Sequence, residues 1–175
     1  MSHESRRPKS IEWYTPPEIF TALDIAFDLD PCAPALPAAS YLPVEHRYSR
    51  PLDGFSLPWE GRVWLNPPYG EETGKWVGKL AHHGEGIALV FVRTDVAWWQ
   101  RAAECADAIC FIKGRVNFIS GDPSVQRHRS GVSPAPSCLL AFGIESAKAV
   151  ASCGLGIVAY PQTCDNNLEL TIAVK

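Results

Sequence analysis

The feature that most constrains the fold is an uninterrupted apolar run from Ile87 to Val92. A half-exposed strand alternates apolar with polar side chains, so six apolar residues in a row predict a strand buried on both faces of a parallel sheet. Apolar segments at 108–112 and 137–142 predict further strands, and helical patterns cover 71–83 and a segment ending near Cys105. This alternation predicts an α/β fold with a mostly parallel sheet.

The rest of the chain adds fewer elements. A strand is expected over 25–29, a helix over 145–153 and a last strand over 155–160. Residues 34–61 are rich in proline and weakly periodic, so no helix or pair of strands is expected there.

Composition and charge are those of a soluble globular protein. At 175 residues, with 46% apolar and 20% charged, the chain can bury a single core. We predict one domain over 11–160, preceded by a disordered N-terminus (1–10) and followed by a tail (161–175). Because the net charge is −3, binding to a polyanion would require a local basic patch.

Two absences narrow the function. No apolar run reaches the roughly 18 residues of a membrane span, and the polar N-terminus lacks the apolar core of a signal peptide, so a cytoplasmic protein without a membrane partner is expected. The six cysteines include no C-x-x-C pair, which argues against a zinc or redox site, and no metal is expected.

The chemistry is concentrated in Asn66-Pro67-Pro68-Tyr69, which follows a short apolar run at 63–65. Two successive prolines cannot continue a strand ladder, so this backbone is stiff and extended at the carboxyl end of a strand, where open α/β sheets bind ligands. The Asn66 side-chain oxygen and the Pro67 carbonyl can together accept the two N–H bonds of an amino group. The Tyr69 ring offers a face for a planar heterocycle. A proline-rich turn without chemistry is the alternative for the tetrapeptide alone.

Asn-Pro-Pro-Tyr is similar to the target-amine motif of S-adenosylmethionine-dependent N-methyltransferases, and the surrounding chain resembles the phage-type DNA N6-adenine methyltransferases. The resemblance implies a compact Rossmann-like class I fold with a reduced strand set, because residues 34–61 are too few for the strands that larger members place there. It also implies S-adenosylmethionine as cofactor, double-stranded DNA as partner and the cytoplasm of a bacterial host. A monomer or weak dimer is expected. The implied catalytic residues are Asn66, Pro67, Pro68 and Tyr69.

The resemblance also places a cofactor site upstream. Thr15, with Pro16 and Glu18 after it, fits a helical capping box, and a Tyr-Thr-Pro at a helix start commonly contacts the cofactor's methionine part in this family. Asp30 follows the first predicted strand, where the family binds the ammonium or ribose, although the glycines usual after it are absent. Capping alone, an acidic strand end and a surface Asp-Gly turn at 53–54 are the alternatives. The expected cofactor-binding residues are Trp13, Tyr14, Thr15, Pro16, Asp30, Pro31, Cys32, Ala33, Asp53 and Phe55.

The DNA contacts are expected after the strand at 108–112. Gly-Arg-x-x-Phe at 114–118 matches a family segment in which Phe118 could cover the second face of a flipped base and Arg115 could bind a phosphate or the base edge. A core aromatic is an equally good interpretation of Phe118. Arg127 and Arg129 lie in a basic, flexible-looking segment that suits phosphate contacts.

The expected function is therefore methylation of adenine N6 in DNA, site-specific or of low specificity, by direct attack of the amine on the cofactor's methyl group. The base would have to be flipped out of the duplex. The same tetrapeptide also serves enzymes that methylate glutamine side chains of proteins or guanine in RNA. A catalytically inactive DNA- or partner-binding module is the third interpretation.

Overall fold

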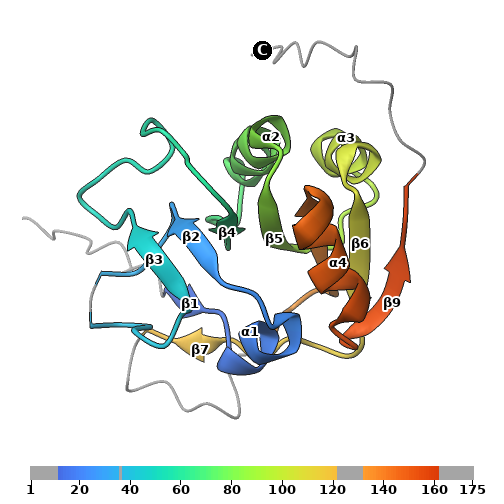
Figure 1. Ribbon diagram of the computed structural model, residues 1–175, viewed down its shortest axis with the longest axis horizontal. Helices are drawn as coiled ribbons and strands as arrows, with labels where there is room; N and C mark the ends of the chain where they lie inside the picture. Colours follow the sequence, from blue (N-terminus) through green and yellow to red (C-terminus); the bar gives the residue numbers. More distant parts are fainter. Residues whose placement is uncertain (1–11, 36, 122–131, 162–175) are drawn as a thin grey trace, which may run out of the picture.

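The computed structural model describes residues 12–35, 37–121 and 132–161, and a seven-stranded sheet forms its centre (Figure 1). The strands lie in the order β3-β2-β4-β5-β8-β6-β9. They are β2 (Phe27–Asp30), β3 (Val44–Arg47), β4 (Val63–Leu65), β5 (Gly86–Phe91), β6 (Ala108–Ile112), β8 (Ser137–Phe142) and β9 (Gly156–Ala159). Two shorter strands, β1 (Trp13–Tyr14) and β7 (Ile119–Ser120), form a separate antiparallel pair.

The sheet is mostly parallel. Strands β3, β2, β4 and β5 are parallel neighbours, while β8 is antiparallel to both β5 and β6, and β9 is antiparallel to β6. Within the described residues, all strands of this sheet except β8 and β9 therefore share one direction. The predicted α/β class and largely parallel sheet are confirmed.

Helices cover both faces of the sheet. The helices are α1 (Pro17–Leu23), α2 (Thr73–His83), α3 (Ala97–Cys105) and α4 (Ile144–Ser152). Helices α1 and α4 pack into one core cluster, and α2 and α3 into the other. In β5, Ile87 and Leu89 belong to the first cluster and Ala88 and Val90 to the second, and all four are fully buried. The apolar run thus forms the strand buried on both faces that its sequence predicted.

The proline-rich segment 34–61 contributes a single strand, β3, which pairs in parallel with β2 in the register Phe27↔Val44. The sequence did not predict it because its residues, Val-Glu-His-Arg, are mostly polar and none of them is fully buried. The other predicted helices and strands of the main sheet begin and end within two residues of their expected positions. Boundaries of this accuracy are typical because helix and strand ends fray.

The predicted capping box is absent. Helix α1 begins at Pro17 with Pro16 at the N-cap position, and no side chain caps it. Thr15 lies one residue before the N-cap position, which Pro16 occupies. The Thr15 hydroxyl oxygen is buried and has no hydrogen-bond partner within the described ranges.

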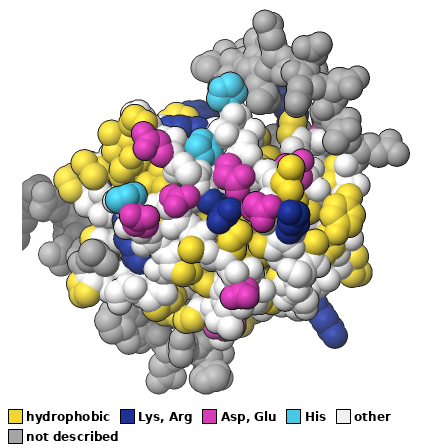
Figure 2. Space-filling model, viewed as in Figure 1, with side chains coloured by type: hydrophobic (Ala, Val, Ile, Leu, Met, Phe, Trp, Pro, Cys, Tyr) yellow, Lys and Arg dark blue, Asp and Glu magenta, His cyan; other side chains and the backbone are white. Residues whose placement is uncertain are grey.

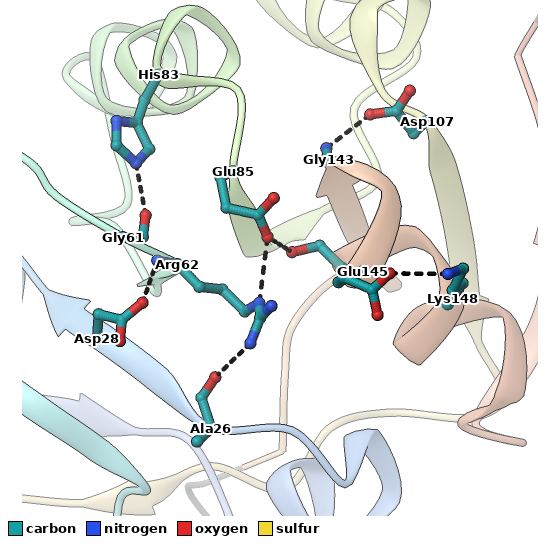
Figure 3. Close-up of polar contacts among 11 residues, drawn as sticks. Ala26, Asp28, Gly61, Arg62, His83, Glu85, Asp107, Gly143, Glu145 and Lys148 are labelled. Atoms are coloured by element: carbon teal, nitrogen blue, oxygen red, sulfur yellow. Dashed lines mark hydrogen bonds and ion pairs between the residues drawn. The ribbon is translucent and has the colours of Figure 1, made fainter.

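A polar network fixes the edge of the sheet at which β4 and β5 begin (Figure 3). Arg62 donates from Nε to Glu85 Oε1 over 3.1 Å and from its main-chain nitrogen to Asp28. The same Glu85 oxygen accepts from the Ser146 hydroxyl of α4 over 2.9 Å. Figure 2, in the same view as Figure 1, shows acidic and basic side chains intermingled across the middle of this face. With this end of β4 fixed, Asn66–Tyr69 follow at the opposite edge.

Candidate active site

A cleft of about 980 Å³ opens where β2 and β4 end. It is lined by residues 12–15, residues 30–35 after β2, Tyr48 and residues 50–54, residues 66–69 after β4, and Trp76 of α2, together with Leu42 and Trp64. This is the edge at which open α/β sheets bind ligands. A shallower depression of about 410 Å³ beside α1 shares no lining residue with the cleft.

Asn66 presents an unused acceptor in this cleft. Its side-chain Nδ2 donates to the main-chain oxygen of Trp13 over 3.1 Å. Its Oδ1 is buried and has no partner among the described residues. Leaving a buried acceptor unpaired costs about 1–3 kcal/mol, so this geometry favours a ligand that brings a donor. The neighbouring Pro67 carbonyl, also at the cleft, accepts no hydrogen bond from any described residue.

Thr73, at the start of α2, fixes the turn after the two prolines. Its hydroxyl donates to the Pro68 carbonyl over 2.8 Å and accepts from the Gly70 N–H over 3.0 Å. The side chain is 4% exposed, so water competes little for either bond. Thr73 therefore holds Pro68 and the adjoining Tyr69 in place, a role that the sequence did not reveal.

The Tyr69 ring is supported from behind and open in front. It stacks on Phe91 at the end of β5, with ring centroids 4.1 Å apart and planes 25° apart. The residue is 37% exposed, although its hydroxyl end is buried and desolvation raises the pKa of Tyr69. Phe91 covers one face of the ring, and Tyr69 lines the cleft, so an aromatic ligand in the cleft can stack on it.

Phe118 does not line the cleft. It is 4% exposed, belongs to the core cluster beneath α1 and α4, and meets the Tyr69 ring edge-on at 6.4 Å. Of its two interpretations, the structure matches the core aromatic, which supports Tyr69 and leaves no open face for a base.

The first expected cofactor segment reaches the cleft through Trp13, Tyr14 and Thr15. Strand β1 is held against β7 in the register Tyr14↔Ile119, and the Thr15 carbonyl accepts from the Tyr41 hydroxyl over 2.7 Å. Pro16 is not among the lining residues. The unpaired Thr15 hydroxyl is a second buried polar atom in the wall of the same cleft.

The second expected segment also lines the cleft. Asp30 is 3% exposed, its Oδ1 accepts from the Cys32 N–H over 2.9 Å, and desolvation raises the pKa of Asp30 to about 7. Pro31, Cys32 and Ala33 continue the wall. Gly54 lies so close that a Cβ there would come within 2.0 Å of the Pro31 carbonyl. The close approach made by this glycine brings the 48–54 wall against the segment after β2.

Asp53 and Phe55, both expected to bind the cofactor, differ in position relative to the cleft. Asp53 lies at the rim, where its carboxylate accepts from the Ser56 hydroxyl over 2.6 Å and from the Phe55 N–H, which lowers the pKa of Asp53. Phe55 does not line the cleft. Its ring packs edge-on against Trp76, which takes that place in the wall.

Lys79 and Trp59 support this wall from behind. Lys79 donates to the Phe55 and Leu57 carbonyls, the latter over 2.7 Å, and its ammonium lies 4.6 Å from the centre of the Trp59 ring. Trp59 in turn stacks on Trp76 at 6.1 Å. Trp76 thus packs against the core and also lines the cleft.

The expected DNA contacts are not assembled at the cleft. Arg115 is exposed on the segment after β6 and is not a lining residue. Arg127 and Arg129 lie outside the described residues. Arg50, Tyr48 and Leu52 do line the cleft.

An α/β sheet with a large polar-and-aromatic cleft at the carboxyl ends of its parallel strands, and unpaired buried oxygens in the wall, is the architecture of a ligand-binding enzyme. The family model described as DNA N-6-adenine-methyltransferase (Dam) matches residues 3–147, and the chain belongs to this family. The resemblance found at 66–69 is thereby confirmed, together with the enzyme class and adenine N6 in DNA as the group that is methylated.

Comparisons with curated proteins and with solved structures gave no significant match to this chain. Across the described ranges, no group of three His, Cys, Asp or Glu side chains is placed to hold a metal ion. No helix among these residues is long and apolar enough to cross a membrane.

Proposed function

We propose that this protein binds S-adenosylmethionine and a flipped adenine of double-stranded DNA side by side in the 980 Å³ cleft and aligns them for methyl transfer to N6. The observation that carries the proposal is the buried, unpaired Oδ1 of Asn66 beside the open face of Tyr69. A planar base with an exocyclic amine supplies both the missing donor and a ring to stack.

The cleft residues fit the cofactor. The unpaired Thr15 hydroxyl and the buried Asp30 carboxylate offer polar partners for its methionine part or ribose, and both line the same cleft. The close contact of Gly54 with Pro31 brings the 48–54 wall against this segment without the glycine-rich turn that the family usually has after Asp30. Trp76 offers an aromatic surface for the adenine ring of the cofactor. Bound S-adenosylmethionine supplies the methyl group. It carries this group on a sulfonium sulfur, which is a good leaving group.

The protein's own part in the reaction is positioning. Asn66 Oδ1 and the Pro67 carbonyl accept the two N6 hydrogens, which directs the nitrogen lone pair away from them. Tyr69, backed by Phe91, holds the ring plane. No protein nucleophile is needed, because N6 would itself bond to the methyl carbon while the carbon–sulfur bond breaks to leave a neutral thioether, and the alkylated N6 would then release one proton to solvent. Alignment of two reactants can lower a barrier by about 7–11 kcal/mol.

The test is incubation of the purified protein with methyl-labelled cofactor and unmethylated duplex DNA, followed by nucleoside analysis. We expect label in N6-methyladenine, and its position by sequencing gives the target site. Asn66→Ala should lose transfer while still binding the cofactor in calorimetry. Label in protein glutamine or RNA guanine, or native transfer by Asn66→Ala, would overturn the proposal. Absence of cofactor binding at millimolar concentration would instead support a non-catalytic binding module.

A further inference from the structure

The Asn66 amide has two orientations with opposite hydrogen-bonding character. With the nitrogen directed into the protein, the oxygen is left for a ligand and accepts a hydrogen bond. With the amide turned over, the NH2 group is left for the ligand and donates. Only the first orientation can hold an amino group, so the site needs a contact that selects it.

The main-chain oxygen of Trp13 provides this contact. It lies 3.1 Å from Asn66 Nδ2, and because a carbonyl oxygen can only accept, the amide nitrogen must be the atom that faces it. Turning the amide over would bring two oxygens together. The selected orientation is the one that leaves Oδ1 without a partner among the described residues.

Trp13 and Asn66 are held by different parts of the fold. Asn66 follows β4 of the seven-stranded sheet, whereas Trp13 belongs to β1, which pairs with β7 in the register Trp13↔Ser120. The β1 segment is further held by a bond from the Gly121 N–H to the Glu12 carbonyl, over 2.7 Å. The contact between Trp13 and Asn66 therefore links the β1 segment to residues 66–69.

We propose that the Trp13 carbonyl is a positioning group that fixes Asn66 as a hydrogen-bond acceptor and thereby makes the site select an amino group over a carbonyl at the reacting position of the base. The proposal rests on the proposed function and adds a cause for its selectivity. A carbonyl at that position would meet another acceptor and leave both unpaired, which sites built on hydrogen bonds reject strongly.

The direct test is Asn66→Asp, which keeps the shape and the acceptor but removes the donor to Trp13. The measurement is binding of duplexes that carry adenine, purine (without the amine) or hypoxanthine (a carbonyl) at the methylated position. The wild type should prefer adenine to purine by about tenfold and reject hypoxanthine further. In Asn66→Asp both carboxylate oxygens accept and neither can donate, so no orientation has to be selected. The preference for adenine should therefore persist at neutral and alkaline pH, although the bond to Trp13 is lost.

Lowering the pH tests the Trp13 contact itself, because a protonated carboxyl, like the amide, has one donor and one acceptor. The Trp13 carbonyl should take the donor and leave the acceptor to the amine, so that the preference persists. Asn66→Ala, the matched control, keeps the Pro67 carbonyl and should show a reduced preference that does not change with pH. The titratable groups of the cleft, Asp30 and Glu12 among them, are present in all three proteins. The ratio of adenine to purine affinity within each protein, compared with the wild type, therefore isolates residue 66.

A second variant does not touch Asn66. Tyr41→Phe removes the hydroxyl that donates to the Thr15 carbonyl and should loosen the β1 segment. It should reduce the adenine preference in the wild-type background and leave it unchanged in Asn66→Ala, as a double-mutant cycle requires. Tyr160→Phe, on an exposed tyrosine outside the cleft, is the control.

Loss of the adenine preference in Asn66→Asp as the pH falls would mean that the protonated carboxyl turns its donor toward the ligand, and it would overturn the inference. An unchanged preference in Tyr41→Phe would do the same. These outcomes are separate from failure of the proposed function, which would appear as an absence of N6-methyladenine in the wild-type reaction. Thermal unfolding and cofactor binding of each variant establish that it is folded.

Discussion

Tyr69 lies almost flat against Phe91, with ring centroids 4.1 Å apart. Tyr69 ends the tetrapeptide after β4, and Phe91 ends the neighbouring strand β5. The strand formed by the apolar run thus ends in Phe91, the side chain that supports the Tyr69 ring. Fold and site are joined at this contact.

Phe91→Leu tests this contact. Loss of a stacked aromatic pair removes about 0.5–1.5 kcal/mol beyond the buried area, so kcat/KM for DNA should fall by about three- to tenfold with cofactor affinity unchanged. Phe111→Leu, a phenylalanine of β6 that packs near Trp99, is the matched control and should affect only the melting temperature. Steady-state kinetics and thermal unfolding distinguish the two. If Phe91→Leu and Phe111→Leu changed kcat/KM equally, Phe91 would have no specific role at the site.

Thr73→Val should loosen the turn at Pro68 and Gly70. It removes two buried hydrogen bonds with little change in volume, and we expect a loss of about 1–3 kcal/mol in unfolding free energy together with a lower kcat. Thr21→Val removes an exposed hydroxyl that bonds the Pro17 carbonyl and should be nearly neutral. Denaturant titration and kcat check both. A Thr73→Val protein with native kcat would show that the turn does not need this hydroxyl.

Asp30 should make cofactor binding depend on pH. Its pKa is about 7 because of desolvation, so half of the carboxyl groups are neutral near neutrality in the protein without ligand. If the ionised form binds the cofactor's ammonium or ribose, affinity should rise as the pH increases through 7 and then level off. Calorimetry at several pH values tests this. Asp30→Asn should bind weakly with a flat profile, and a steep profile in that variant would contradict the assignment.

The same shift predicts a stability effect of opposite sign. Because the pKa in the folded state lies above the unfolded value near 3.8, the folded protein binds the proton more tightly, and this group's contribution to stability declines as the pH rises from about 4 to 7. Asp30→Asn should therefore raise the melting temperature of the ligand-free protein at alkaline pH and have little effect at acidic pH. A lower melting temperature at alkaline pH would show that the charge is better compensated than its burial indicates.

Lys79→Met should weaken cofactor binding, although Lys79 does not line the cleft. The substitution removes the bonds to the Phe55 and Leu57 carbonyls and the contact with the Trp59 ring, which together hold the 53–57 turn behind Trp76. We expect the dissociation constant for S-adenosylmethionine to rise by about tenfold or less. Lys75→Met, on the exposed side of the same helix, loses only an ion pair with Glu72 and should bind normally. Equal affinities for the two variants would contradict this role.

The sequence predicted most of the fold because its strongest signals are local. The alternation along 71–142 predicted the helices and the main-sheet strands of that range, although not the two-residue strand β7, since apolar periodicity reflects burial directly. It missed β3 because that strand is short and polar. The capping prediction for Thr15 was wrong because a correct motif spacing does not specify which residue begins the helix when two prolines follow.

For the site, the sequence by itself determined Asn66-Pro67-Pro68-Tyr69 and its place at a strand end, because the two prolines restrict the backbone without help from distant residues. Only the tertiary structure decided what surrounds these residues. It placed the Trp13 carbonyl on the Asn66 amide, Phe91 behind Tyr69 and Trp76 in the cleft wall, and it buried Phe118 in the core. The physical reason is that these contacts join segments far apart in the chain, and neither periodicity nor motif spacing carries information on distances between them.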